Sequence, residues 1–114
     1  MIPRIKVCCI SSFREARLAL GYGASALGFV SEMPSGPGVI PEELIGEIIS
    51  RVPPPIATFL LTAATTADAI IGQQQRTRAN TLQIVDKVAS DELRLLRNDL
   101  RGVGLVGSRH QGVT

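Results

Sequence analysis

The chain has 114 residues, of which 45% are hydrophobic and 19% charged, and its formal net charge is +2. This length and charge content are typical of one compact domain. The longest apolar run, residues 56–61, is far shorter than the roughly 20 residues that cross a bilayer. Arg4 and Lys6 interrupt the apolar opening of the chain. We therefore expect no membrane span and no secretory signal, and a protein that stays in the cytoplasm.

The polar composition excludes several kinds of site. Cys8 and Cys9 are the only cysteines and His110 is the only histidine, which is too few ligands for a zinc site. Residues 21–26 have the G-x-G-x-x-A spacing of a dinucleotide-binding loop. They follow an expected helix and open an expected strand, which is the reverse of the order that such a loop requires. Only 4% of the residues are aromatic. We expect no metal site, no dinucleotide-binding loop and no nucleic-acid partner.

Short apolar runs alternate with helix patterns along the whole chain. The expected strands are residues 5–10, 26–30, 57–61, 81–85 and 103–106. Strict alternation of strands and helices predicts a parallel sheet with helical crossovers. Because the runs are almost continuously apolar, we expect strands that are covered on both faces.

Local capping patterns mark where four helices begin. The expected starts are Ser12 with Glu15 as a capping box, Pro41 at a first helical position, Thr65 or Thr66, and Ser90 as an N-cap. Gly21 with Gly23 and Gly102 follow the first and fourth helices and favour their termination.

Two α/β architectures fit this string of elements. One is an open flavodoxin-like sheet, in which the first strand lies beside the third. The other is part of a TIM barrel, where about 250 residues form eight βα units. On that interpretation residues 1–106 form about four units plus a fifth strand, which is roughly half a barrel, and residues 107–114 form a polar tail.

Several segments follow the pattern of one enzyme family. Residues 6–10 read Lys-Val-Cys-Cys-Ile, like a K-I-C-G first strand, and residues 23–30 read Gly-Ala-Ser-Ala-Leu-Gly-Phe-Val, like a G-A-x-x-L-G-F-[VI] second strand. Residues 34–42 occupy the place of a serine-proline loop, residues 80–85 that of a V-V-Q-L-H strand, and residues 100–103 that of a later turn. Up to about Val106, the chain resembles the phosphoribosylanthranilate isomerases of tryptophan biosynthesis.

The resemblance implies a TIM barrel that catalyses an Amadori rearrangement of a sugar phosphate without a cofactor. Such an enzyme is an intramolecular oxidoreductase that converts an aldose-amine into a ketose-amine. Cys8 matches the general base, and Lys6 on the same strand face favours its thiolate. By the same resemblance, we expect Lys6, Ser35 and Gly36 to contact the substrate.

The chain departs from the family pattern in ways that affect the site. Cys9 takes the place of a glycine, and we expect it to have a structural role. The loop at residues 35–38 lacks the family's arginine, and Val85 replaces a histidine. In the family, the catalytic aspartic acid and the phosphate-binding loops belong to later strands, beyond residue 114. We therefore expect this chain alone to be catalytically incomplete.

A second hypothesis treats the chain as a non-catalytic association module. An unclosed barrel leaves strand edges at residues 5–10 and 103–106 without partners and exposes apolar faces. Self-association or completion by a C-terminal half would cover them.

Overall fold

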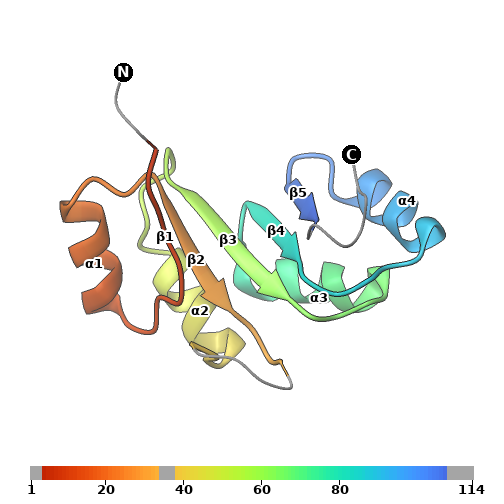
Figure 1. Ribbon diagram of the computed structural model, residues 1–114, viewed down its shortest axis with the longest axis horizontal. Helices are drawn as coiled ribbons and strands as arrows, with labels where there is room; N and C mark the ends of the chain where they lie inside the picture. The colour runs from red at the N-terminus through yellow and green to blue at the C-terminus, as the bar shows by residue number, and fades with distance from the viewer. Residues whose placement is uncertain (1–3, 34–37, 108–114) are drawn as a thin grey trace.

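The computed structural model describes residues 4–33 and 38–107 (Figure 1). In this part of the chain, five strands alternate with four helices. The strands are β1 (Lys6–Val7), β2 (Ala26–Val30), β3 (Ala57–Thr62), β4 (Thr81–Ile84) and β5 (Gly104–Gly107). The helices are α1 (Phe13–Gly21), α2 (Glu42–Ile49), α3 (Ala67–Thr77) and α4 (Ser90–Asp99). The alternation predicted from the sequence is confirmed, although β5 extends to Gly107, and residues 108–114 of the expected tail lie outside the described residues.

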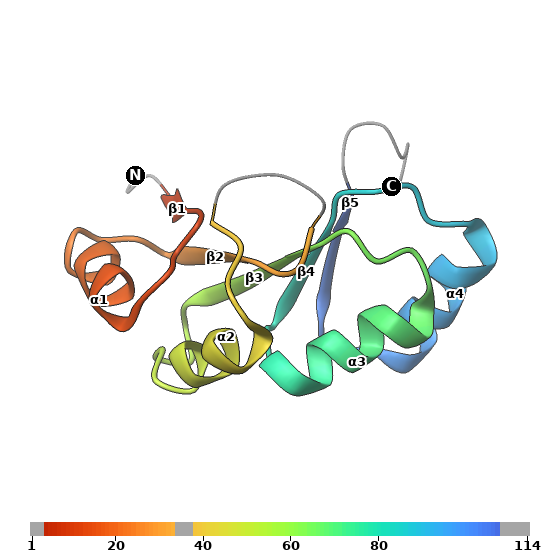
Figure 2. The same cartoon turned by 90° about the horizontal axis from the view of Figure 1, so that it is seen from below.

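The strands form one parallel sheet in the order β1-β2-β3-β4-β5. A flavodoxin-like sheet would place β1 beside β3, whereas among the described strands β1 pairs with β2 and β3 pairs with β2 and β4. The four helices lie on one side of the sheet, as Figure 2 shows. Sequential order with helices on a single side is the arrangement of half a TIM barrel, so this prediction is confirmed.

One face of the sheet packs against the helices and forms the core. Leu27, Phe29, Leu60 and Leu82 are fully buried there, together with Ile45, Ile48, Ile70 and Leu96 from the helices. Only β2 is buried at every position, whereas buried and partly exposed residues alternate along β3 and β4. The expectation that all strands are covered on both faces is therefore wrong, because half a barrel covers only the outer face of its sheet.

The first helix begins with the predicted side-chain cap. The Ser12 hydroxyl accepts a hydrogen bond from the Glu15 amide at 3.1 Å. The Glu15 carboxylate does not return to Ser12 but accepts from the Ser11 amide at 2.7 Å and from the Ser11 hydroxyl at 2.8 Å. These bonds, the backbone one first, hold the pKa of Glu15 below its usual value. The capping box is thus present with its reciprocal bond shifted by one residue.

The other helix starts agree with the sequence to within one residue. Thr66 caps α3 by accepting from the Ala69 amide at 3.3 Å. Pro41 is the N-cap of α2 rather than its first residue, and Ser90 is the first residue of α4, after Ala89 as N-cap. None of the helices in the described ranges is long and apolar enough to cross a membrane.

Candidate functional site

The carboxyl ends of the strands are where a TIM barrel places its chemistry. Cys8 follows β1, Ser31 follows β2, Thr62 ends β3 and Val85 follows β4. The Val85 amide continues the ladder by donating to the Thr62 carbonyl at 3.1 Å. The candidate site therefore lies at this edge of the sheet.

A β-bulge at Cys8 and Cys9 ends the first strand. Lys6 pairs with Ala26, and a regular parallel ladder would bring the Cys9 amide to the Gly28 carbonyl. The Ile10 amide donates to that carbonyl instead, at 3.0 Å, so β1 contains one extra residue. The sequence predicted a first strand that runs to Ile10. Because of this bulge, β1 ends at Val7 instead. Bulges at barrel rims redirect side chains, and this one sits beside the proposed base.

Cys8 lies on the helix-free side of the sheet, next to Gly28. A Cβ atom added at Gly28 would lie 3.1 Å from Cys8 Sγ and 3.5 Å from Lys6 Cε. Gly28 therefore leaves the space that both side chains occupy, and Lys6 and Cys8 share a face as predicted. The Cys8 thiol is exposed. We call this helix-free side, which carries Lys6, Cys8, Phe59 and Gln83, the open face.

Lys6 reaches across the open face to a distant strand. Its Nζ donates to Gln83 Oε1 at 2.6 Å and lies 4.1 Å from the centre of the Phe59 ring. In a flat sheet, β1 and β4 would be about 14 Å apart, three strand spacings. A direct contact between their side chains requires the sheet to curve around the open face, as the wall of a barrel does. The ammonium group of Lys6 is thus held over the concave side.

Cys9 adopts a backbone conformation that favours glycine. Its φ angle is +61°, in the left-handed region. Its side chain lies against Gly38, whose φ is +84°, and a Cβ atom added there would come within 2.8 Å of Cys9 Cβ. The positive φ explains why a glycine suits this position, and the packing agrees with a structural role for Cys9. Ser35 and Gly36, both predicted to contact the substrate, lie outside the described residues.

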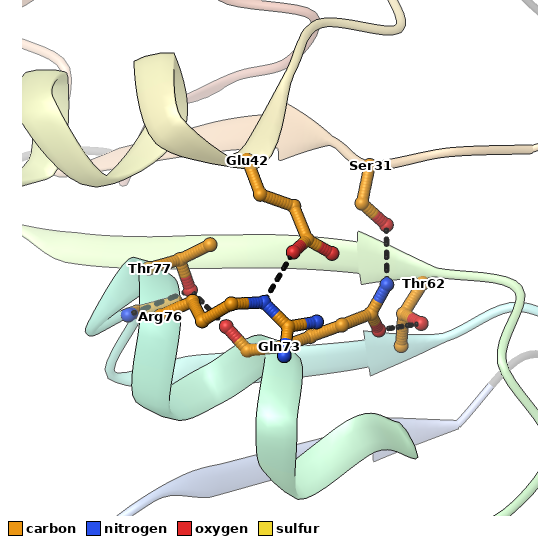
Figure 3. A network of polar contacts seen from close by, with 7 residues as sticks. Ser31, Glu42, Thr62, Gln73, Arg76 and Thr77 are labelled. Atoms are coloured by element: carbon orange, nitrogen blue, oxygen red, sulfur yellow. Dashed lines mark hydrogen bonds and ion pairs between the residues drawn. The ribbon is translucent and has the colours of Figure 1, made fainter.

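A buried polar network lies below the ends of β2 and β3 (Figure 3). Gln73 Oε1 accepts from the Thr62 hydroxyl at 2.5 Å, and Gln73 Nε2 lies 3.5 Å from Ser31 Oγ. Ser31 in turn donates to the Leu61 carbonyl at 2.8 Å. This network was not predicted from the sequence, because residues 73–75 are three consecutive glutamines, which by themselves indicate only a short polar run. The helical spacing of Gln73 from the buried Ile70 is the signal that identifies it as inward-facing.

An ion pair fixes α2 against α3 beside this network. Arg76 Nε donates to Glu42 Oε1 at 2.6 Å, as Figure 3 also shows. This hydrogen bond is the main cause that holds the pKa of Glu42 below its usual value. The helices approach closely here, since a Cβ atom at Gly46 would lie 2.9 Å from the Arg76 carbonyl oxygen. The network and the ion pair together hold the helices that support the carboxyl ends of β2 and β3.

Comparison with known proteins agrees with this geometry. No family model matches the chain. It is 30% identical over 106 residues to the N-(5'-phosphoribosyl)anthranilate isomerase of Haloferax volcanii, covering 92% of this chain and 47% of that protein. The corresponding enzyme of Methanosarcina acetivorans is 27% identical over 95 residues, which cover 82% of this chain and 40% of the enzyme.

Solved structures show the same fold. The N-(5'-phosphoribosyl)anthranilate isomerase of Pyrococcus furiosus superposes with a TM-score of 0.81 at 24% identity, covering 93% of this chain and 50% of that one. The chain is thus similar, in sequence and in fold, to about half of a phosphoribosylanthranilate isomerase. It spans about half the length of the curated family members it matches.

Proposed function

We propose that this chain belongs to the phosphoribosylanthranilate isomerase family and contributes the first half of an active site for the Amadori rearrangement of phosphoribosylanthranilate. The observation that carries the proposal is the exposed Cys8, whose side chain lies on the open face at the carboxyl end of β1. One similar solved structure is described as a phosphoribosyl anthranilate isomerase in complex with reduced 1-(o-carboxyphenylamino)-1-deoxyribulose 5-phosphate. A ligand of this class would occupy the open face.

Cys8 would act as the general base in this reaction. Its thiolate removes the proton from C2 of the sugar after the furanose ring has opened. The electron pair of that C–H bond forms a C1=C2 double bond, while the C1=N double bond of the ring-opened imine gives its electron pair to the nitrogen. The resulting enol-amine becomes the ketose-amine when C1 takes up a proton and the C2 hydroxyl loses one. Lys6 contributes a positive charge on the same face, where it would attract an anionic group of the substrate once its ammonium leaves Gln83.

The general acid is the part of the site that the described strand ends lack. Ser31, Thr62 and Val85 follow or end their strands and carry no carboxylate. Asp86 accepts from the Lys87 amide at 2.8 Å and is exposed, after β4. We do not assign it the role of the acid. A complete site therefore requires further βα units, which we propose a C-terminal half would supply.

Turnover measurements test this proposal directly. The chain is assayed on phosphoribosylanthranilate alone and mixed with a separately expressed C-terminal half of a curated family member. We expect turnover only in the mixture, and its loss in Cys8→Ser. Cys9→Gly is the matched control, because it removes the adjacent thiol at a position whose φ suits glycine. Turnover that survives Cys8→Ser would remove Cys8 from the role of base.

The exposed sheet edges favour a second candidate function, association without catalysis. β1 and β5 end the sheet on its two sides, and Ile5 and Val106 beside or within them are 45% and 41% exposed. Unpaired parallel edges next to apolar side chains favour pairing with another chain. Sedimentation of the chain at micromolar concentration measures this, and a monomer that binds no dye for exposed apolar surface would exclude it.

A further inference from the structure

The two adjacent cysteines lie at a point where the strand loses its regular geometry. In a regular strand, consecutive side chains point to opposite faces, which keeps neighbouring sulfur atoms apart. Here the bulge and the positive φ of Cys9 interrupt that alternation between Cys8 and Ile10. Both cysteines are exposed residues, so a small oxidant can reach this segment of the chain.

We propose that Cys8 and Cys9 form a reversible thiol–disulfide pair. Its regulatory meaning rests on the proposed function, because a disulfide would remove the thiolate that is assigned as the base. The pair itself requires only the two thiols and an oxidant, which is a hydroperoxide. Cys9 thus has a second consequence besides its packing against Gly38: it makes the base position sensitive to oxidation.

The oxidation proceeds in two balanced steps. The Cys8 thiolate attacks one oxygen of hydrogen peroxide, the O–O bond breaks, and the departing hydroxide takes up a proton to become water. Cys8 is then a sulfenic acid. The Cys9 sulfur attacks the Cys8 sulfur, the S–S bond forms, the S–O bond breaks and a second water leaves. Overall, two thiols lose two electrons and two protons, and the peroxide is reduced to two waters.

Chain geometry makes this disulfide easy to reduce. The Cα atoms of neighbouring residues are about 3.8 Å apart across a trans peptide. Disulfides prefer a separation of about 4.4–6.8 Å, so a bond between neighbours is strained. Strained and exposed disulfides have more oxidising potentials and are the labile ones. A bond between Cys8 and Cys9 is therefore suited to reversible control rather than to stabilising the fold.

Mass spectrometry and thiol counting test the pair without reference to catalysis. The native chain is treated with hydrogen peroxide, and unreacted thiols are alkylated. We expect the intact mass to fall by two hydrogen atoms, neither cysteine to be alkylated, and dithiothreitol to restore both. In Cys9→Ser and Cys9→Gly, we expect oxidation to stop at a Cys8 sulfenic acid that dimedone traps. Cys9→Gly suits the local backbone, so the test does not depend on tolerance of serine.

Three results would overturn the proposal. In the first, Cys8 gains oxygen while Cys9 can still be alkylated. In the second, a non-reducing gel shows a disulfide between two copies of the chain, and in the third, peroxide does not react with either cysteine. These readouts do not use the isomerase assay, so they remain decisive if the proposed function fails. If the mixture of halves turns over substrate, we expect peroxide to abolish turnover and dithiothreitol to restore it.

Discussion

Gln73 links α3 to the carboxyl ends of two strands, and its replacement tests how much that link stabilises the fold. Gln73 is 8% exposed, and its amide contacts Thr62 and Ser31, which are fully buried. Gln73→Met keeps the length and approximate volume of the side chain but removes the acceptor for the Thr62 hydroxyl. The variant therefore separates the polar contacts from the packing.

The expected loss follows from the polar group that is left behind. A buried donor without an acceptor costs about 1–3 kcal/mol, because folding removes its hydrogen bond to water and no hydrogen bond within the protein replaces it. We expect Gln73→Met to lower the free energy of unfolding by that amount. For a domain of this size, each kcal/mol lowers the melting temperature by about 3–6 °C.

Urea unfolding followed by circular dichroism measures the change in the free energy of unfolding. An m-value that is the same in the variant and the natural chain checks that unfolding remains two-state. Gln75→Met makes the same chemical change on the exposed face of α3, and we expect it to stay within about 0.5 kcal/mol of the natural chain. The double variant Gln73→Met with Thr62→Val should cost less than the sum of the two single changes. Equal effects at positions 73 and 75, or strict additivity in the double variant, would refute the reasoning.

Four further substitutions have expected effects that follow from the structure. Cys9→Gly should raise the free energy of unfolding by up to about 1 kcal/mol, since glycine adopts the left-handed φ of this position without strain. This gain should outweigh the added freedom that glycine gives the unfolded chain. A lower free energy of unfolding in urea would contradict this prediction. Gly46→Ala should lower the free energy of unfolding by about 1–3 kcal/mol, because the new Cβ atom would lie 2.9 Å from the Arg76 carbonyl oxygen. Gly21→Ala in α1 is the control. Its Cβ atom would meet nothing within 4 Å, so the same assay should show no change or a gain in stability. The pKa of Glu42 is lowered in the folded chain, so its contribution is present above the usual carboxyl value of 4.5 and is lost as the pH falls through the folded pKa. Glu42→Gln should therefore reduce the acid-induced loss of stability in unfolding curves below that pH, and an unchanged pH profile would count against the Arg76 contact as its cause.

Local signals in the sequence predicted most of the secondary structure. The hydroxyl of Ser12, the hydroxyl of Thr66 and the glycine at position 23 act within a few residues, so their effect is visible without the fold. Strand periodicity also placed Lys6 and Cys8 on one face correctly. These predictions succeed because caps, turns and side-chain alternation depend on backbone geometry over a few neighbouring residues.

The candidate site was predictable only in part. The family pattern singled out Cys8 as the candidate base, which stays a prediction, and the structure places this residue directly after β1. The bulge was not predictable, because it depends on which carbonyl of β2 the Ile10 amide meets. Gln73 was likewise missed, since its partners Ser31 and Thr62 are far away in the sequence and come together only in the folded sheet.

The sequence by itself determined the alternation of strands and helices, the helix starts and the thiol at the end of the first strand. The tertiary structure alone decided the order of the strands, the single covered face and the curvature that brings Lys6 to Gln83. The physical reason is the range of the interactions. Capping and periodicity are set within one turn or a few residues, whereas sheet order, bulges and buried polar partners depend on segments that meet only when the chain has folded.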